Sequence, residues 1–79
     1  MDYNEVIKGL SETINRLTIN KDFELKDLFV GEIWASYSKG DRITLGKTFK
    51  SKVLDNEIDG VEFVGRAKNN HSIYKKVEE

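Results

Sequence analysis

The sequence predicts an α+β fold in which three helices are followed by a C-terminal β-hairpin. Three observations lead to this prediction: apolar residues at helical spacing near the N-terminus, a second helical repeat in the middle of the chain, and two segments rich in β-branched and aromatic residues near the C-terminus. The chain has 79 residues, the size of one domain with one hydrophobic core. We therefore expect a single domain over residues 1–79.

Apolar residues near the N-terminus recur at steps of three and four, which predicts a helix over about residues 2–17. Asp2 and Glu5 favour its N-terminal end through the helix dipole, and Arg16 favours its C-terminal end. The expected buried stripe consists of Tyr3, Val6, Ile7, Leu10, Ile14 and Leu17.

Residues 23–25 alternate apolar, polar and apolar, which predicts a short strand or an extended entry into the next helix. Residues 26–37 carry apolar side chains on nearly all sides of a helical wheel, which is typical of a short helix buried on several sides. In the alternative interpretation Gly31 splits this segment into a helix and a turn, so the sequence leaves open whether residues 31–38 are helical.

The composition of residues 38–41 predicts a turn, with Asp41 as the N-cap of a third helix that runs to about Leu54. Its buried side is predicted from residues four apart: Leu45, Phe49 and Val53. Gly46 lies beside this stripe, where the lack of a side chain would let another helix approach closely.

Residues 61–64 and 72–77 are predicted strands, joined by a polar and basic connection over residues 65–71. The order helix, short strand, helix, helix and hairpin is typical of a winged helix-turn-helix, in which the short strand at 23–25 joins the hairpin as a third member.

The third helix carries the strongest candidate site. With about 14 residues it would be about 20 Å long, and its polar face would be the recognition surface for the major groove of DNA. The alternative is that this face is only the solvated side of an amphipathic helix. The candidate residues on this helix are Arg42, Thr44, Lys47, Thr48, Lys50, Ser51 and Lys52.

The hairpin connection is the second candidate site, because long basic or polar side chains there suit a wing that reaches phosphates or the minor groove. Ordinary turn chemistry explains the same residues. The candidates are Arg66, Lys68, Asn69 and Asn70, and His71 beside them is interpreted as a surface residue of the turn.

Composition excludes several classes of site. The chain has no cysteine and one histidine, so we expect no disulfide, no metal site and no cofactor. No motif of an enzyme active site is present, so we expect no catalytic residues. The absence of a long apolar run or a signal-peptide core predicts a cytoplasmic protein that does not enter a membrane.

The formal net charge of −1 argues against a general polyanion binder. The distribution of charge is more informative. Residues 39–54 carry five cations against one carboxylate, namely Lys39, Arg42, Lys47, Lys50 and Lys52 against Asp41.

Several of these residues form a pattern that resembles a known family. The pattern consists of residues 23–29, Trp34, Arg42, residues 45–50, Val53 and Tyr74-Lys75-Lys76. It is similar to a family of small uncharacterised proteins from Gram-positive bacteria and their phages and mobile elements, classified as a domain of unknown function. The resemblance covers about residues 23–77. It implies a small winged-helix-like fold and no enzyme activity, and it supplies no ligand.

Two functions are compatible with these observations. The first is a module that binds double-stranded DNA, as a small transcriptional regulator or a mobile-element accessory protein, with a homodimer formed through the first helix. The alternative is a protein-interaction module on the same scaffold, with an unidentified protein partner and no nucleic-acid binding. A continuous basic face would favour DNA, whereas an exposed apolar patch around Ile33, Trp34 or Tyr37 would favour a protein partner.

Overall fold

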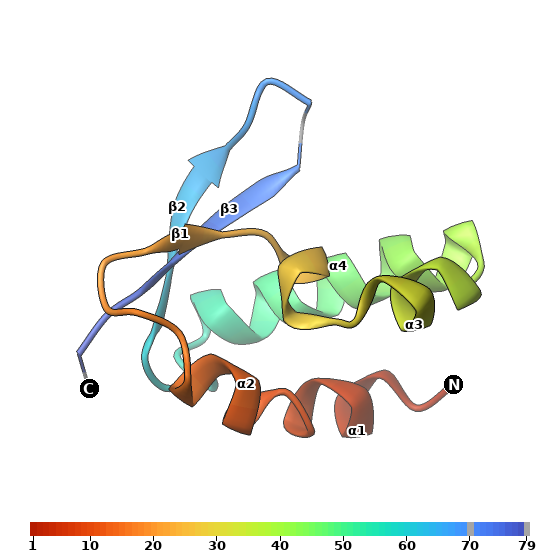
Figure 1. Cartoon of the computed structure of the whole chain (residues 1–79), viewed down its shortest axis with the longest axis horizontal. Coiled ribbons are helices and arrows are strands. Elements are labelled where there is room, and N and C mark those ends of the chain that lie inside the picture. Colours follow the sequence, from red (N-terminus) through yellow and green to blue (C-terminus); the bar gives the residue numbers. More distant parts are fainter. Residues whose placement is uncertain (70, 79) are drawn as a thin grey trace.

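A computed structural model describes residues 1–69 and 71–78, and it confirms the α+β prediction (Figure 1). The sheet is antiparallel and three-stranded, in the order β1-β3-β2. In chain order the elements are α1 (Tyr3–Lys8), α2 (Ser11–Asn15), β1 (Asp22–Phe23), the 3-10 helix η1 (Leu25–Leu28), α3 (Gly31–Ser36), α4 (Lys39–Leu54), β2 (Val61–Arg66) and β3 (Ser72–Lys76).

The short segment before the second helical region joins the sheet as predicted, although the strand covers Asp22–Phe23 instead of residues 23–25, because Leu25 begins η1. Phe23 of β1 pairs with Tyr74 of β3, and Tyr74 pairs on its other side with Phe63 of β2. The register shifts between Phe63 and Gly65, where β2 bulges. The central position of β3 therefore places Tyr74 in the middle of the sheet.

The prediction of one helix over residues 2–17 is wrong, because α1 and α2 are separate. At the break, Leu10 N–H donates to the carbonyl of Ile7, three residues back, instead of continuing the four-residue ladder. Gly9, a poor helix former, stands at this break with φ −67° and ψ −13°. Because the backbone there stays nearly helical, Ile7, Leu10 and Ile14 are all still buried.

The predicted helix over residues 26–37 is also two elements. The 3-10 helix η1 begins with a capping box between Glu24 and Asp27, and extended backbone at Phe29 and Val30 separates it from α3. Residues 31–36 are helical, which answers the question that the sequence left open.

The long helix α4 begins three residues earlier than predicted. Ser38, and not Asp41, is its N-cap, because the Ser38 hydroxyl accepts a hydrogen bond from the Asp41 N–H at 3.0 Å. At the other end, Asn56 has φ 59°, and the Glu57 N–H donates to the Lys52 carbonyl at 2.9 Å. This is a Schellman motif with asparagine in the left-handed position, and it ends the helix where the sequence predicts.

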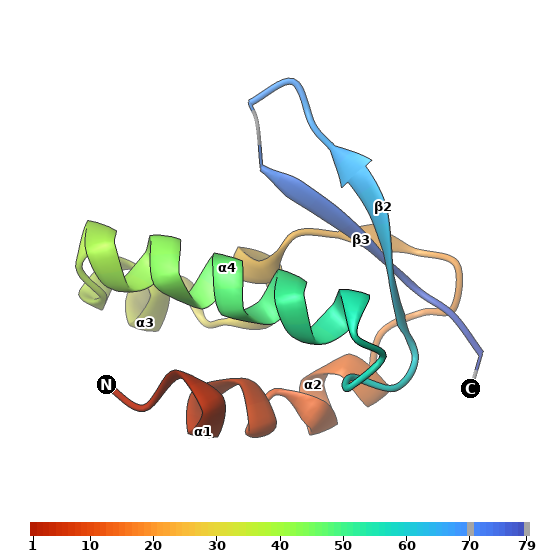
Figure 2. The same cartoon turned by 180° about the vertical axis from the view of Figure 1, so that it is seen from behind.

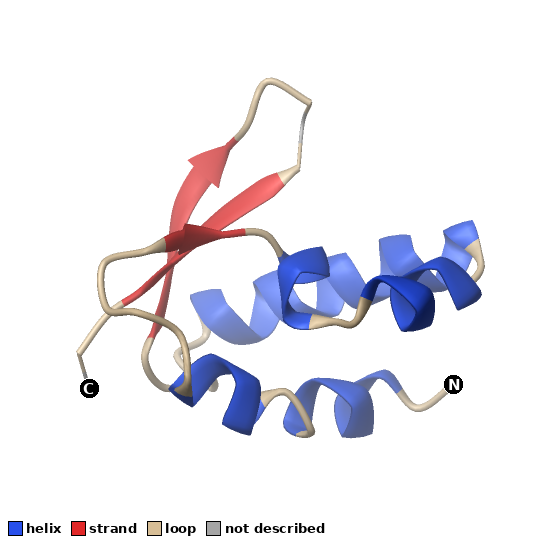
Figure 3. Ribbon diagram, in the orientation of Figure 1, coloured by secondary structure: helices blue, strands red, loops and turns tan. Residues whose placement is uncertain are grey.

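The core lies between α4 and the elements on its two sides. In both views α1 and α2 run along one side of α4, and the sheet lies on the other side (Figures 1 and 2). The short helix α3 lies at the end of the molecule where α4 begins, away from the hairpin tip (Figure 3). The buried apolar residues are Ile7, Leu10, Ile14, Phe23, Leu25, Leu28, Leu45, Phe49, Val53, Val61 and Tyr74.

Candidate nucleic-acid interface

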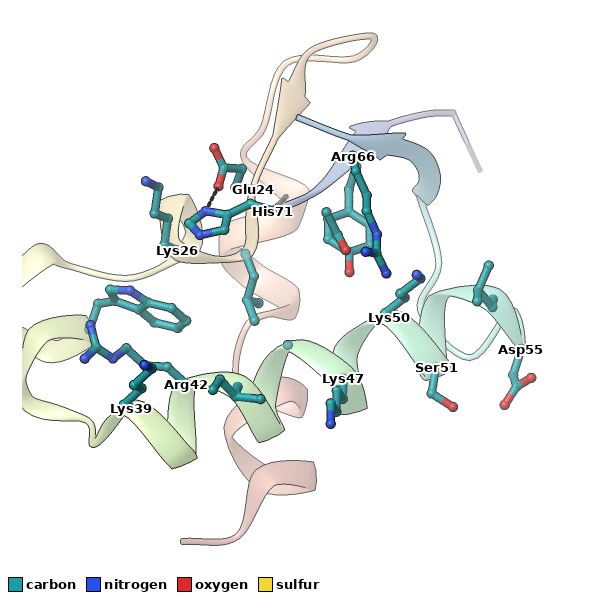
Figure 4. Close-up of a pocket in the computed structure, with 17 residues that line it drawn as sticks. Glu24, Lys26, Lys39, Arg42, Lys47, Lys50, Ser51, Asp55, Arg66 and His71 are labelled. Atoms are coloured by element: carbon teal, nitrogen blue, oxygen red, sulfur yellow. Dashed lines mark hydrogen bonds and ion pairs between the residues drawn. The ribbon is translucent and has the colours of Figure 1, made fainter. Parts of the chain in front are cut away.

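A groove of about 820 Å³ separates α4 from the β-hairpin and η1. Arg66 extends from the hairpin toward α4, and Lys50 extends from α4 toward the hairpin (Figure 4). Tyr74 and Leu25 contribute to the apolar floor between them. The groove therefore brings together the two segments that the sequence predicts as binding elements.

Positive charge is concentrated in this groove. Among the described residues, two carboxylates line it, those of Glu24 and Asp55. Six cationic side chains line the same groove: Lys26, Lys39, Arg42, Lys47, Lys50 and Arg66. Since the whole chain has 13 Lys and Arg against 14 Asp and Glu, the groove carries a formal charge of +4 and the rest of the chain −5.

The cations of α4 differ in how firmly they are held. Lys50 is half-buried, with its Nζ 4.6 Å from the centre of the Phe63 ring, a cation–π distance. Arg42 is half-buried too, and its buried Nε has no hydrogen-bond partner among the described residues. Lys39 and Lys47 are exposed. These two lysines are therefore the α4 cations most available to an anionic ligand.

Three predicted recognition residues do not face the groove. Thr44 and Thr48 are half-buried, and together with Lys52 they follow a four-residue repeat along the flank of α4. This flank faces α1, because Thr44 lies beside the Tyr3 phenol and Lys52 lines a separate hollow with residues of α1 and α2. The predicted polar face of this helix is therefore divided, with Lys47 and Ser51 on the exposed groove side.

The same flank holds α1 against the start of α4. The Tyr3 hydroxyl donates a hydrogen bond to the Asp41 carboxylate, with 2.7 Å between Oη and Oδ1. This bond raises the pKa of Tyr3 and, together with a smaller contribution from Ser38, lowers the pKa of Asp41. Asp41 thus serves in tertiary packing and not in the groove.

The predicted residues of the hairpin tip have different positions. Arg66 lies at the end of β2 and lines the groove, whereas Lys68 is exposed in the connection. Asn69 accepts a hydrogen bond from the His71 N–H at 3.2 Å, so it shapes the turn. Asn70 lies outside the described residues.

His71 links the hairpin to η1. Its Nδ1 lies 2.7 Å from Oε1 of Glu24 (Figure 4), the residue that caps η1. The sequence interpretation of His71 as a surface turn residue is correct in its exposure, but it misses this partner 47 positions away.

Among the groove residues that sequence reasoning did not assign to the site are two cations and two exposed apolar side chains. Lys26 comes from η1, and Lys39 belongs to the segment predicted as a turn. Ile43 and Leu54 are the exposed apolar residues of α4, and both line the groove. The helical repeat of α4 was a signal for the last two, because it places them opposite the buried stripe.

Gly46 lines the groove as well, and its predicted role is wrong. A Cβ placed on this residue would meet no atom within 4 Å beyond its chain neighbours and the backbone of its own helix. No other helix therefore approaches α4 at this point, and the space beside Gly46 opens into the groove.

Within the described part of the chain, no three histidine or acidic side chains converge as metal ligands do. The helices there are also too short or too polar for any of them to cross a membrane.

A family model matches residues 8–76, and the chain belongs to that family, the domain of unknown function DUF1413. The match starts within α1, so it extends beyond the resemblance that the sequence suggested over residues 23–77. No curated protein and no solved structure matches the chain.

Proposed function

We propose that this chain is a DNA-binding module with a winged helix-turn-helix fold. The helices and strands follow the order of that fold, and a sheet in the order β1-β3-β2 suits a hairpin wing joined by one short strand. In this arrangement α4 is the recognition helix, and β2, β3 and the connection between them form the wing.

The concentration of cations in one groove is the observation that carries the proposal. A chain with a net charge of −1 has little general attraction for a polyanion. A groove with a formal charge of +4 between a helix and a hairpin provides a local attraction for a polyanion. Phosphate contacts supply most of the sequence-independent affinity for DNA. The acidic remainder of the surface would orient the duplex toward the groove.

The dimensions of α4 suit the major groove of DNA. Its 16 residues give a rod of about 24 Å, and the major groove admits a single α-helix. Lys39 and Lys47 would contact phosphates, Ser51 would face the duplex, and Arg66 and Lys68 would contact phosphates from the wing.

A dimer formed through the first helix has little support in this fold. The apolar side of α1 and α2 is buried against α4, and their outward residues, including Asn4, Lys8, Glu12 and Arg16, are polar and exposed. We therefore propose that one copy contacts DNA by itself, with the modest affinity of a small footprint.

Fluorescence anisotropy with a labelled random duplex across a salt series tests the proposal. Wild-type affinity should fall steeply as salt increases. The double variant Lys39→Ala/Lys47→Ala should bind roughly tenfold more weakly or worse and should lower the slope of log K against log salt by about two. The matched control is Lys8→Ala/Arg16→Ala, which removes the same charge from exposed positions outside the groove.

Equal weakening by both double variants would show that only net charge matters, and this would contradict a groove-specific site. Absence of binding by folded wild-type protein at low salt would overturn the proposal altogether. Circular dichroism of each variant establishes that the protein is folded in either case.

One observation favours the alternative, a protein partner. Val30 and Ile33 are 64% and 48% exposed, beside the half-buried aromatic cluster of Phe29, Trp34 and Tyr37. Exposed apolar groups of this kind mark protein contacts when they are contiguous. If this patch binds a partner, Ile33→Ser should abolish that contact without changing DNA affinity.

A further inference from the structure

Two large apolar side chains of α4 are exposed in the cationic groove. Ile43 is 49% exposed and Leu54 is 57% exposed, and both line the groove. Exposed isoleucine loses the favourable free energy that burial of its methyl groups would give. A ligand that covers Ile43 must therefore be anionic around its edges and apolar at one point.

The neighbours of Ile43 define the surroundings of that point. Lys39 and Lys47 lie one turn before and one turn after it on α4, and both are exposed. Gly46 leaves open space beside it. The isoleucine thus stands between two cations with no side chain of Gly46 to obstruct an approaching group.

Double-stranded DNA offers this combination in its major groove. Phosphates line the two edges, and the C5-methyl of thymine is the apolar group that the base edges present between them. We infer that Ile43 reads a thymine methyl in the DNA target, and that it sets a preference for an A·T pair at one position. This inference rests on the proposed DNA-binding function.

Position along the helix distinguishes Ile43 from Leu54. A recognition helix contacts bases mainly through its N-terminal residues, and Ile43 lies in the first half of α4. Leu54 is the last residue of that helix, about 16 Å further along. It adjoins Asp55, whose carboxylate repels phosphate. Leu54 therefore provides a matched control of similar exposure and chemistry.

Replacement of thymine by uracil tests the inference, because it removes the methyl group and leaves the base-pairing edge intact. Duplexes selected from a random pool by wild-type protein are resynthesised with uracil at one thymine position at a time. At one position the wild-type affinity should fall roughly fourfold to tenfold. Ile43→Ala should lose a similar factor on the thymine duplex and should not distinguish uracil from thymine there. Leu54→Ala should discriminate as the wild type does.

The outcomes separate this inference from the proposed function. Two outcomes would overturn the contact between Ile43 and a thymine methyl but leave DNA binding intact. One is salt-dependent binding without any effect of uracil, and the other is a selection that yields no preferred sequence. Discrimination that persists in Ile43→Ala also overturns it. Failure of the wild type to bind any duplex overturns both.

Discussion

Tyr74 is the residue on which the sheet and α4 converge. It is 1% exposed, and its ring meets Phe49 of α4 edge-on, with 4.9 Å between ring centres. The rings of Phe63 and Phe23 lie on either side of it at 5.8 and 6.0 Å. Each aromatic pair adds about 1 kcal/mol beyond the burial of area, so this tyrosine holds together both walls of the groove.

The buried phenol should make the fold sensitive to alkali. Burial raises the pKa of Tyr74, while a hydrogen bond with Ser72 opposes the shift. Its contribution to stability is therefore complete below the ordinary phenol pKa of about 10. It is lost as pH rises further, because only the unfolded chain ionises readily. Urea unfolding between about pH 9 and about pH 11 should show a steeper loss for the wild type than for Tyr74→Phe. An equal pH dependence in the two proteins would contradict this account.

At the residue scale, sequence periodicity predicted the buried side of α4 but not the roles of its other side chains. Leu45, Phe49 and Val53 are buried as predicted, because a four-residue repeat depends only on the helix itself. Thr44 and Lys52 were assigned to the interface, and they face α1 instead. Which flank of a helix a neighbour covers is decided by tertiary packing, and a single sequence does not encode it locally.

At the scale of elements, the types of structure were easier to predict than their boundaries. The hairpin, the short strand and α4 all exist near their predicted positions. The two wrong predictions, over residues 2–17 and 26–37, arise from local hydrogen bonding. In the first, Leu10 bonds to Ile7. In the second, the capping box of Glu24 and Asp27 begins a 3-10 turn that extended residues then end. The spacing of apolar residues does not predict these local hydrogen bonds.

Gly46 leads to a prediction about α4 as an element. Glycine inside a helix is less stable than alanine by about 1 kcal/mol, and a methyl group here would meet no atom within 4 Å beyond its chain neighbours and the backbone of its own helix. Gly46→Ala should therefore raise the free energy of unfolding by roughly 0.5–1 kcal/mol in urea denaturation. Gly65→Ala is the matched contrast, since φ at that bulge is 154° and a side chain is strained there. A loss of stability in Gly46→Ala would contradict the open space seen beside α4.

At the scale of the whole molecule, the chain separates its charges by tertiary structure. The groove draws Lys26 from η1, Lys39 and Lys47 from α4, and Arg66 from the hairpin. The basic stretch over residues 39–54 indicated part of this surface. Its extent follows from the packing of three distant segments, which no window of sequence contains. A surface that gathers like charges in this way favours binding of an anionic ligand. The same charges repel one another and lower the stability of the protein when no ligand is bound.

This opposition between binding and stability is measurable without any ligand. The Debye length is about 30 Å at 0.01 M salt and about 10 Å at 0.1 M, so added salt should relieve repulsion in the groove. Lys39→Ala/Lys47→Ala should be more stable than the wild type at the lower ionic strength, by about 0.5 kcal/mol, and should gain less from salt. Lys8→Ala/Arg16→Ala removes cations from the part of the surface with a formal charge of −5 and should shift in the opposite direction. For each protein, the change in urea midpoint between the two ionic strengths is compared with that of the wild type. Effects of helix propensity cancel in this difference, because they are the same at both salt concentrations. Shifts of the same sign in both double variants would show that the cations do not act as a localised cluster, and that the charge of the groove is already dispersed by solvent.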